Sequence, residues 1–204
     1  MNKNDVLTDP KKLVTSFAIV IVFLLCLFFI RVRNGTQVRA TVDYAMSEKV
    51  VLYRQDDEKW ADDKLGNSTY SMAGSGCLVC CIASAISDAE NMITPGELNK
   101  LFSENGVYDT EGNIQWGQIS EMDEFEVEVF SSPSNEIIEK CLADGKYPIV
   151  RVRIKGLGNF HYVLIVGTEE GKYVCMDPLE DALTTLSDYG NRVYAIRCVW
   201  KESV

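Results

Sequence analysis

Apolar and polar positions divide the chain into two unlike parts. Leu13–Ile30 is an apolar run of about 18 residues without a charge, and Arg31 and Arg33 follow it. From about residue 49 onward, apolar positions recur in short groups, which is typical of a folded domain. The pattern predicts four parts: a short N-terminal tail over 1–12, a transmembrane anchor over 13–30, a stalk or linker over 31–48, and a domain over 49–204.

The apolar run has the length of a membrane-spanning helix. A cleaved signal peptide is the alternative, but its apolar region is usually shorter and is followed by a small-residue cleavage site. Here Arg-Val-Arg follows, which favours an uncleaved, single-pass anchor. Basic residues on both sides give no clear orientation. A short N-terminal tail most simply stays in the cytoplasm, so we expect the domain to lie on the extracytoplasmic side of the membrane.

The first half of the domain is predicted to be helical. Cys77–Ile86 (CLVCCIASAI) is apolar or small on every face, as in a helix buried at the centre of a domain. Thr94, Pro95 and Glu97 have the spacing of a capping box with proline in the first turn. Further helices are predicted at 114–122 and 132–142. A long polar loop, 54–76, precedes the first helix, and long loops are often functional.

The C-terminal third is rich in β-branched and aromatic runs separated by turn residues, which predicts strands. The expected strands are 127–130, 148–154, 160–166, 173–176 and 192–200, and 50–53 is expected to be a strand or an extended segment. Both faces of the run HYVLIVG are apolar, which indicates a covered central strand. Helices followed by closely linked strands predict an α+β fold with a mainly antiparallel sheet.

Charge narrows the range of partners. Residues 1–33 hold five of the 20 basic and two of the 30 acidic residues, so the remaining chain carries a net charge of −13. Such a domain is expected to repel nucleic acid and anionic lipid. We therefore expect no nucleic-acid partner.

Three of the seven cysteines lie in the stretch GSGCLVCCIA. Cys77 follows a glycine-rich turn at the start of the predicted helix, where the free N–H groups and the helix dipole stabilise a thiolate. Cys80 and Cys81 lie one turn deeper in apolar company, which makes thiols inert. Cys77 is therefore the candidate nucleophile, whereas spacing alone leaves open a disulfide such as Cys141–Cys198.

His161 is the only histidine, so a nucleophile that needs an imidazole base must use it. It begins the predicted central strand, at an end of the sheet where sites form. Asp177 lies 16 residues later, at the end of the next strand, where it either makes a turn or orients the imidazole. Gln55, in the long loop, is a candidate side-chain donor to an oxyanion.

Two other uses of the cysteines are weaker. A zinc or iron–sulfur site needs a second pair of ligands, and Cys141, Cys175 and Cys198 are scattered singly. A thioredoxin-like redox motif needs a βαβ unit, which does not precede this helix. We therefore expect no metal site among these cysteines.

Four motifs stand in order: Gln55 in QDDEKW, Cys77 in GSGCLVCCIASAI, His161 in NFHYVLIVG, and Asp177 in YVCMDP. Together with TPGEL and GKYPIVRVRI they resemble the bacterial papain-like cysteine peptidases of the double-glycine, bacteriocin-processing type, in a stand-alone membrane-anchored form. The resemblance covers roughly residues 50–200. It implies a papain-like fold with the cysteine helix packed on the sheet. The Cys80-Cys81 pair departs from the small residues usual in that helix.

By position, the resemblance implies that Cys77 is the nucleophile, His161 the base and then acid, and Asp177 the orienting group. It implies that Gln55 and the Cys77 backbone N–H form the oxyanion hole. The expected reaction is hydrolysis of a peptide or protein substrate through a thioester, which needs no metal and no organic cofactor. Two alternatives stay open: a silent peptidase-fold binding or scaffold domain, and a transpeptidase or cell-wall amidase with the same triad. The substrate and oligomeric state are not specified.

Overall fold

A computed structural model describes residues 10–33, 35–46, 50–87 and 91–201. It divides into two compact units, 1–35 and 36–204. The described helices are α1 (Pro10–Arg33), α2 (Met72–Ser75), α3 (Cys77–Ile86), α4 (Pro95–Glu104), α5 (Trp116–Ser120) and α6 (Asn135–Ala143), with 3-10 turns η1 (Ile154–Gly156) and η2 (Leu186–Tyr189).

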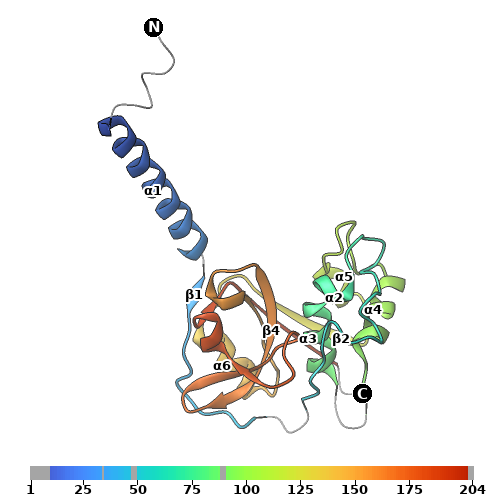
Figure 1. Ribbon diagram of the computed structural model, residues 1–204. Helices are drawn as coiled ribbons and strands as arrows, with labels where there is room; N and C mark the ends of the chain where they lie inside the picture. The colour runs from blue at the N-terminus through green and yellow to red at the C-terminus, as the bar shows by residue number, and fades with distance from the viewer. Residues whose placement is uncertain (1–9, 34, 47–49, 88–90, 202–204) are drawn as a thin grey trace. The chain divides into compact units, whose positions relative to one another are not determined.

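Helix α1 contains the predicted membrane-spanning run (Figure 1). Its segment Pro10–Ile30 is long and apolar enough to cross a membrane, and the side chains of this segment are exposed in the structure. A signal sequence near an N-terminus also meets this criterion of length and composition. The predicted tail falls partly on residues 1–9, which lie outside the described residues, and α1 already begins at Pro10.

The second unit is a mixed helical and β-sheet domain, as predicted. Its main sheet has the order β2-β8-β3-β4-β5-β6, and all neighbouring strands are antiparallel. The strands are β2 (Phe125–Phe130), β3 (Ile149–Arg153), β4 (Phe160–Glu169), β5 (Lys172–Met176), β6 (Thr184–Thr185) and β8 (Ala195–Lys201). A separate ribbon pairs β1 (Thr36–Gln37) with β7 (Arg192–Val193).

Strand β4 lies inside the sheet, which confirms the prediction from its two apolar faces. Leu164 and Val166 on one face belong to a core that contains α3, whereas Val163 and Ile165 on the other belong to a core that contains α6. The sheet is therefore covered on both faces. Figure 1 shows α2–α5 gathered on one side of the domain.

Helix α3 has the predicted bounds and forms the centre of the larger core. Its residues from Val79 to Ala83 are almost completely buried. Such burial removes apolar surface from water on every side of the helix and stabilises it by roughly 1.5–3 kcal/mol for each large side chain. Replacing Ile82 by alanine would leave a cavity and cost about 2–5 kcal/mol.

Local capping signals place the ends of the surface helices. Thr94 Oγ1 accepts from the Glu97 N–H, and the Glu97 carboxylate accepts from the Thr94 N–H, so the predicted capping box is present on α4. Ser134 caps α6 through the Ile137 N–H. The predicted helix over 114–122 is shorter in the structure, where α5 covers only Trp116–Ser120.

The predicted stalk over 31–48 is corrected by the structure, because the domain begins at Thr36 rather than at 49. Residues 36–46 form a strap along the domain surface. Val38 is buried and donates from its N–H to the Asn191 carbonyl, while Tyr44 and Thr168 exchange hydrogen bonds. The signal missed in the sequence is the alternation of buried Val38 and Ala40 with exposed polar neighbours.

The strap and the loop 54–76 both pack against the rest of this unit. A Cβ at Gly167 would lie 2.9 Å from Met46 Cα, so the strap passes β4 at a point where only glycine fits. Residues 50–53 lie in no strand. The loop 54–76 includes helix α2 and is held to the core by Trp60, whose indole N–H donates to the Arg54 carbonyl at 2.8 Å.

Candidate active site

Cys77 is the first residue of α3 and is partly exposed, whereas Cys80 and Cys81 are fully buried. Burial raises the pKa of the Cys80 and Cys81 thiols far above the ordinary value for cysteine, and the nearby Cys77 adds to this. A Cβ at Gly76 would lie 2.6 Å from the Met72 carbonyl oxygen, so this entry to α3 needs glycine. The three cysteines are therefore separated as the sequence predicts.

His161 and Asp177 meet across the β4–β5 pair. Leu164 lies opposite Met176 in the antiparallel register, so His161 and Asp177 lie near the same end of this strand pair. His161 Nε2 lies 2.6 Å from Asp177 Oδ1, and both residues are buried. The imidazole also lies near the Cys77 thiol, which contributes to the raised pKa of His161. The structure thus brings together the three residues that the sequence predicts as a triad.

Electrostatics favour the charged forms of this buried pair. Burial alone would lower the pKa of His161, but hydrogen bonds from Asp177 and Cys77 raise it from 6.5 to about 9. Burial alone would raise the pKa of Asp177, yet its hydrogen bond with His161 and the positive imidazolium hold it below the usual value. At neutral pH the site therefore holds an imidazolium beside a carboxylate.

Two further groups hold the Asp177 carboxylate. The Leu179 backbone N–H donates to Oδ1 at 2.8 Å, and the buried Tyr189 hydroxyl donates to Oδ2. Burial and the neighbouring carboxylate raise the pKa of Tyr189, so it remains a protonated donor. Sequence analysis did not identify Tyr189, since only the fold of η2 brings it to this place.

Gln55 lies between the two halves of the site. Its backbone N–H donates to the Pro178 carbonyl at 3.0 Å, next to Asp177, and its side-chain Nε2 donates to the Ala73 carbonyl at 2.6 Å. In a continuous helix the Ala73 carbonyl would accept from the Cys77 N–H. Among the described residues, that N–H has no backbone acceptor. Gln55 thus takes the carbonyl that the Cys77 N–H would otherwise use.

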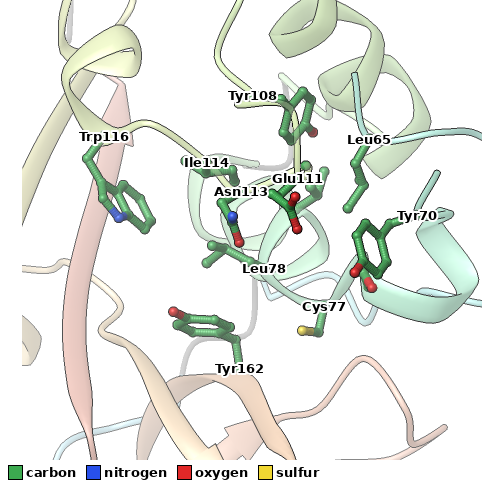
Figure 2. Close-up of a pocket in the computed structure, with 13 residues that line it drawn as sticks. Leu65, Tyr70, Cys77, Leu78, Tyr108, Glu111, Asn113, Ile114, Trp116 and Tyr162 are labelled. Carbon is green, nitrogen blue, oxygen red and sulfur yellow. The ribbon is translucent and has the colours of Figure 1, made fainter. Parts of the chain in front are cut away.

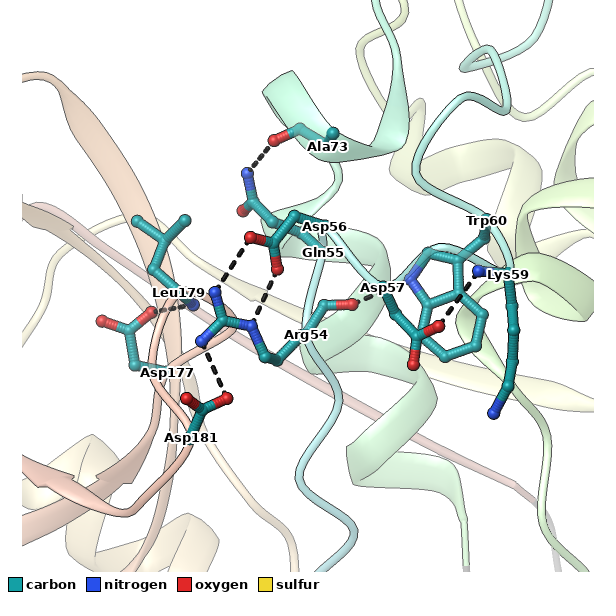
Figure 3. A network of polar contacts seen from close by, with 10 residues as sticks. All are labelled: Arg54, Gln55, Asp56, Asp57, Lys59, Trp60, Ala73, Asp177, Leu179 and Asp181. Atoms are coloured by element: carbon teal, nitrogen blue, oxygen red, sulfur yellow. Dashed lines mark hydrogen bonds and ion pairs between the residues drawn. The ribbon is translucent and has the colours of Figure 1, made fainter.

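Arg54 ties the Gln55 loop to the turn that follows Asp177. Its guanidinium binds Asp56 at 2.8 Å and Asp181 at 2.9 Å, as Figure 3 shows. The hydrogen bond with Asp56 dominates the rise in the pKa of Arg54, which is charged in any case. This network spans the two chain segments that carry Gln55 and Asp177, so it fixes their separation at the surface of the site.

A cleft of about 280 Å³ begins at Cys77 (Figure 2). Its walls combine aromatic and aliphatic side chains with polar ones, among them Ser75 and, on one loop, Glu111 and Asn113. The lining residues named in Figure 2 are Leu65, Tyr70, Cys77, Leu78, Tyr108, Glu111, Asn113, Ile114, Trp116 and Tyr162. The size and the mixed lining suit a side chain of a bound molecule.

Asp109 organises the loop that forms one wall of this cleft. Its Oδ1 accepts from the backbone N–H groups of Glu111 at 2.9 Å and Asn113 at 2.8 Å. The hydrogen bond with the Asn113 side chain is the main reason why the pKa of Asp109 is lowered. The loop therefore has a defined shape at neutral pH, although much of it is exposed.

Comparisons with known proteins add no family to this geometry. No family model matches the chain, and a comparison with curated proteins found no match. Among the described residues, no three His, Cys, Asp or Glu side chains gather in a way that would hold a metal ion.

Proposed function

We propose that the domain is a papain-like cysteine peptidase that hydrolyses peptide bonds. The observation that carries this proposal is the His161 imidazole, which is hydrogen-bonded to Asp177 at 2.6 Å and lies close enough to the Cys77 thiol for that thiol to raise its pKa. An activated cysteine nucleophile has this arrangement: a buried carboxylate orients an imidazole, and the imidazole lies beside a thiol at the N-terminus of a helix. The cleft that begins at Cys77 gives a substrate access to the sulfur.

In this mechanism His161, as the imidazolium, already holds the proton taken from the Cys77 thiol, and the Cys77 sulfur attacks the carbonyl carbon of the scissile peptide bond. The resulting oxyanion accepts from the Cys77 N–H and from the second N–H of the Gln55 amide. His161 then donates its proton to the leaving amine, and a thioester remains. Water, deprotonated by His161, releases the acid product and restores the thiol.

Selective alkylation tests the nucleophile. Full-length protein in detergent is treated with a limiting amount of iodoacetamide, and the modified cysteines are located by mass spectrometry. We expect Cys77 to react before Cys80 and Cys81, because it is exposed and paired with an imidazole. Equal modification of all three thiols would contradict the proposal.

Cleavage of a peptide library tests the activity. The unmodified chain should cut a subset of the library, and Cys77→Ala should cut none of it. Cys81→Ala is the matched control, since it removes a buried thiol from the same helix. Addition of a competing amine distinguishes hydrolysis from transpeptidation by the products formed. A folded chain whose cleavage survives Cys77→Ala would exclude this mechanism.

We also propose that helix α1 anchors the peptidase in a membrane. Its length and composition support this proposal.

A further inference from the structure

Three arginines share one face of the main sheet, the face that packs against α3. Arg151 and Arg153 are two residues apart on β3, so their side chains lie on the same face. Arg197 on β8 lies opposite Ile149, which places it on that face too. We call Arg151, Arg153 and Arg197 the arginine row. They are partly exposed.

The arginine row has no carboxylate partner among the described residues, where the ion pairs involve other side chains. The Nε atom of each arginine is buried and makes no hydrogen bond. Burial lowers the pKa of Arg197, and the nearby positive charge of Arg151 lowers it further. Three neighbouring cations without a counter-charge are unfavourable in the free protein, so the row is suited to an anion.

Aromatic rings hold the row in place. The Arg151 and Arg153 guanidiniums lie 4.3 Å and 4.0 Å from the centre of the Phe160 ring, and Arg197 lies 5.5 Å from that of Trp116. Such cation–π contacts fix the planes of the guanidiniums without neutralising their charge. Nη1 of Arg153 donates to the Gly158 carbonyl, and Nη1 of Arg197 donates to the Phe130 and Ile196 carbonyls. These carbonyls do not neutralise the charge, so the remaining guanidinium N–H groups are the ones available to a carboxylate.

The arginine row continues the cleft that begins at Cys77. Trp116 and Tyr162 line that cleft, and they are also neighbours of the row. Trp116 contacts Arg197, and Tyr162 lies directly opposite Arg151 in the β3–β4 register. Arg151 and Arg153 are separated by about 7 Å, the two-residue repeat of an extended chain. Alternate side chains of an extended peptide have the same repeat.

We propose that the arginine row binds carboxylates of the peptide substrate, so that preferred substrates carry acidic side chains a few residues to one side of the scissile bond. The inference rests on the proposed peptidase function and names the substrate class. The net charge of −13 beyond residue 33 disfavours a long polyanion or an anionic membrane as the occupant. A short acidic peptide segment can contact the arginine row without approaching the acidic surface of the rest of the domain.

Binding to an inactive variant tests the inference separately from catalysis. Full-length Cys77→Ala protein in detergent is titrated with two fluorescent peptides of equal length, one with glutamate at alternate positions and one with glutamine there. Fluorescence anisotropy should show at least about tenfold tighter binding of the glutamate peptide. Arg151→Gln and Arg153→Gln should each weaken that binding about tenfold and leave the glutamine peptide unaffected.

The matched control is Lys100→Gln, which removes a cation that is exposed on α4 and paired with Glu104. It should leave both affinities unchanged. Arg153→Lys keeps the charge but not the planar fork, so it should give an intermediate loss for the glutamate peptide. Thermal unfolding of each variant identifies any that fail to fold, and the comparison of the two peptides on the parent protein needs none of these variants.

Three outcomes would overturn the inference. They are equal binding of the two peptides, equal loss in the Lys100 control, and arginine-dependent binding of single-stranded DNA or phosphatidylglycerol vesicles without binding of the glutamate peptide. Glutamate-selective binding by a chain that cleaves no library peptide would retain the inference and reject the peptidase. Cleavage without any preference for acidic sequences would do the reverse.

Discussion

The proton on His161 links the geometry of the site to the pH at which it works. The pKa of this imidazole is raised to about 9, so the cation that must protonate a leaving amine is present at neutral pH and is lost above pH 9. We expect kcat/KM for a library-selected peptide to fall as pH rises through about 9. A pH–rate profile measures this fall directly, as the alkaline limb of the profile.

Replacing Asp177, the partner of His161, should move the alkaline limb of the pH–rate profile. In Asp177→Asn the carboxylate that raises the pKa of His161 is gone, and burial still favours the neutral ring, so the limb should shift to lower pH. Glu180→Gln, an exposed change nearby, should leave it in place. The folded-state pKa exceeds the ordinary 6.5, so the stability contribution of the ion pair is complete below about 6.5 and disappears as pH rises through 9. A limb that stays near 9 in Asp177→Asn would refute this account.

Tyr189 should act as a positioning residue. Its hydroxyl donates to the Asp177 oxygen that His161 does not use, so it limits the rotation of the carboxylate. We expect Tyr189→Phe to lower kcat about tenfold, or ~1.4 kcal/mol, with little change in KM. Steady-state kinetics of the library-selected peptide separate the two constants.

The matched control for Tyr189 is Tyr173→Phe. Tyr173 is also buried, and its hydroxyl contacts the carboxylate of Glu139 at 3.5 Å, away from the triad. A similar loss of kcat in both variants would show a general effect of removing a buried hydroxyl, and would remove Tyr189 from the site.

At the scale of elements, the strap 36–46 should contribute to the stability of the domain. Val38 is 1% exposed in the core that contains α6, whereas Val42 in the same strap is 51% exposed. We expect Val38→Ala to lower the free energy of unfolding by about 2 kcal/mol, and Val42→Ala to change it by less than about 0.5 kcal/mol. Urea unfolding of the full chain in detergent measures both, and equal effects would argue against a packed strap.

Helix α6 and strand β8 bring two buried thiols together. The Sγ atoms of Cys141 and Cys198 lie 2.8 Å apart, and the residues are 57 positions apart in sequence. Diamide should oxidise this pair, removing two electrons and two protons and forming one S–S bond. A loop of this length predicts stabilisation of about 4 kcal/mol from restriction of the unfolded chain.

Peptide mapping under non-reducing conditions measures the Cys141–Cys198 cross-link, and thermal unfolding with and without reductant measures its effect. Cys198→Ala should abolish the cross-link, whereas Cys175→Ala should not, because Cys175 lies in the core that contains α6, beside the Tyr173 carbonyl, and not at the Cys141–Cys198 pair. A cross-link that involves mainly Cys77 would contradict the predicted pairing.

These elements also show which features can be predicted from sequence. Helix α3 and the strand at His161 were predictable because the apolar residues that bury them follow one another in the sequence. The same holds for Cys77, which follows a glycine turn, and for Asp177, which ends a strand. The positions of Val38 and Tyr189 depend on partners far along the chain, such as Asn191 and Asp177, and no local pattern identifies those partners.

The arginine row was missed for a related reason. The alternation of Arg151 and Arg153 indicates a shared face, but it gives no information on whether a carboxylate from another strand faces them. Only the register of β3 against β4 and β8 shows that the neighbours are aromatic. Electrostatic pairing is a property of the folded sheet, so it could not be read from one strand.

At the scale of the whole molecule, helix α1 is expected to anchor the proposed peptidase in a membrane. The apolar segment of α1 has the length of a bilayer core, and the acidic domain has little attraction for anionic lipid. Membrane association should therefore depend on α1 alone. We expect the full chain, expressed in bacterial cells, to sediment with membranes and to resist extraction at alkaline pH.

Charges placed in the middle of α1 test this dependence. Leu24→Arg together with Leu25→Arg should release the protein into the soluble fraction, because each arginine at the centre of a membrane helix costs about 2.5–3.5 kcal/mol. Lys100→Gln, a change in the domain, should have no effect. The mass of the sedimented protein distinguishes an anchor from a signal sequence: an anchor keeps residues 1–33, whereas cleavage after the apolar run removes them. Intact protein that is extracted as readily as the double variant would exclude α1 as an anchor.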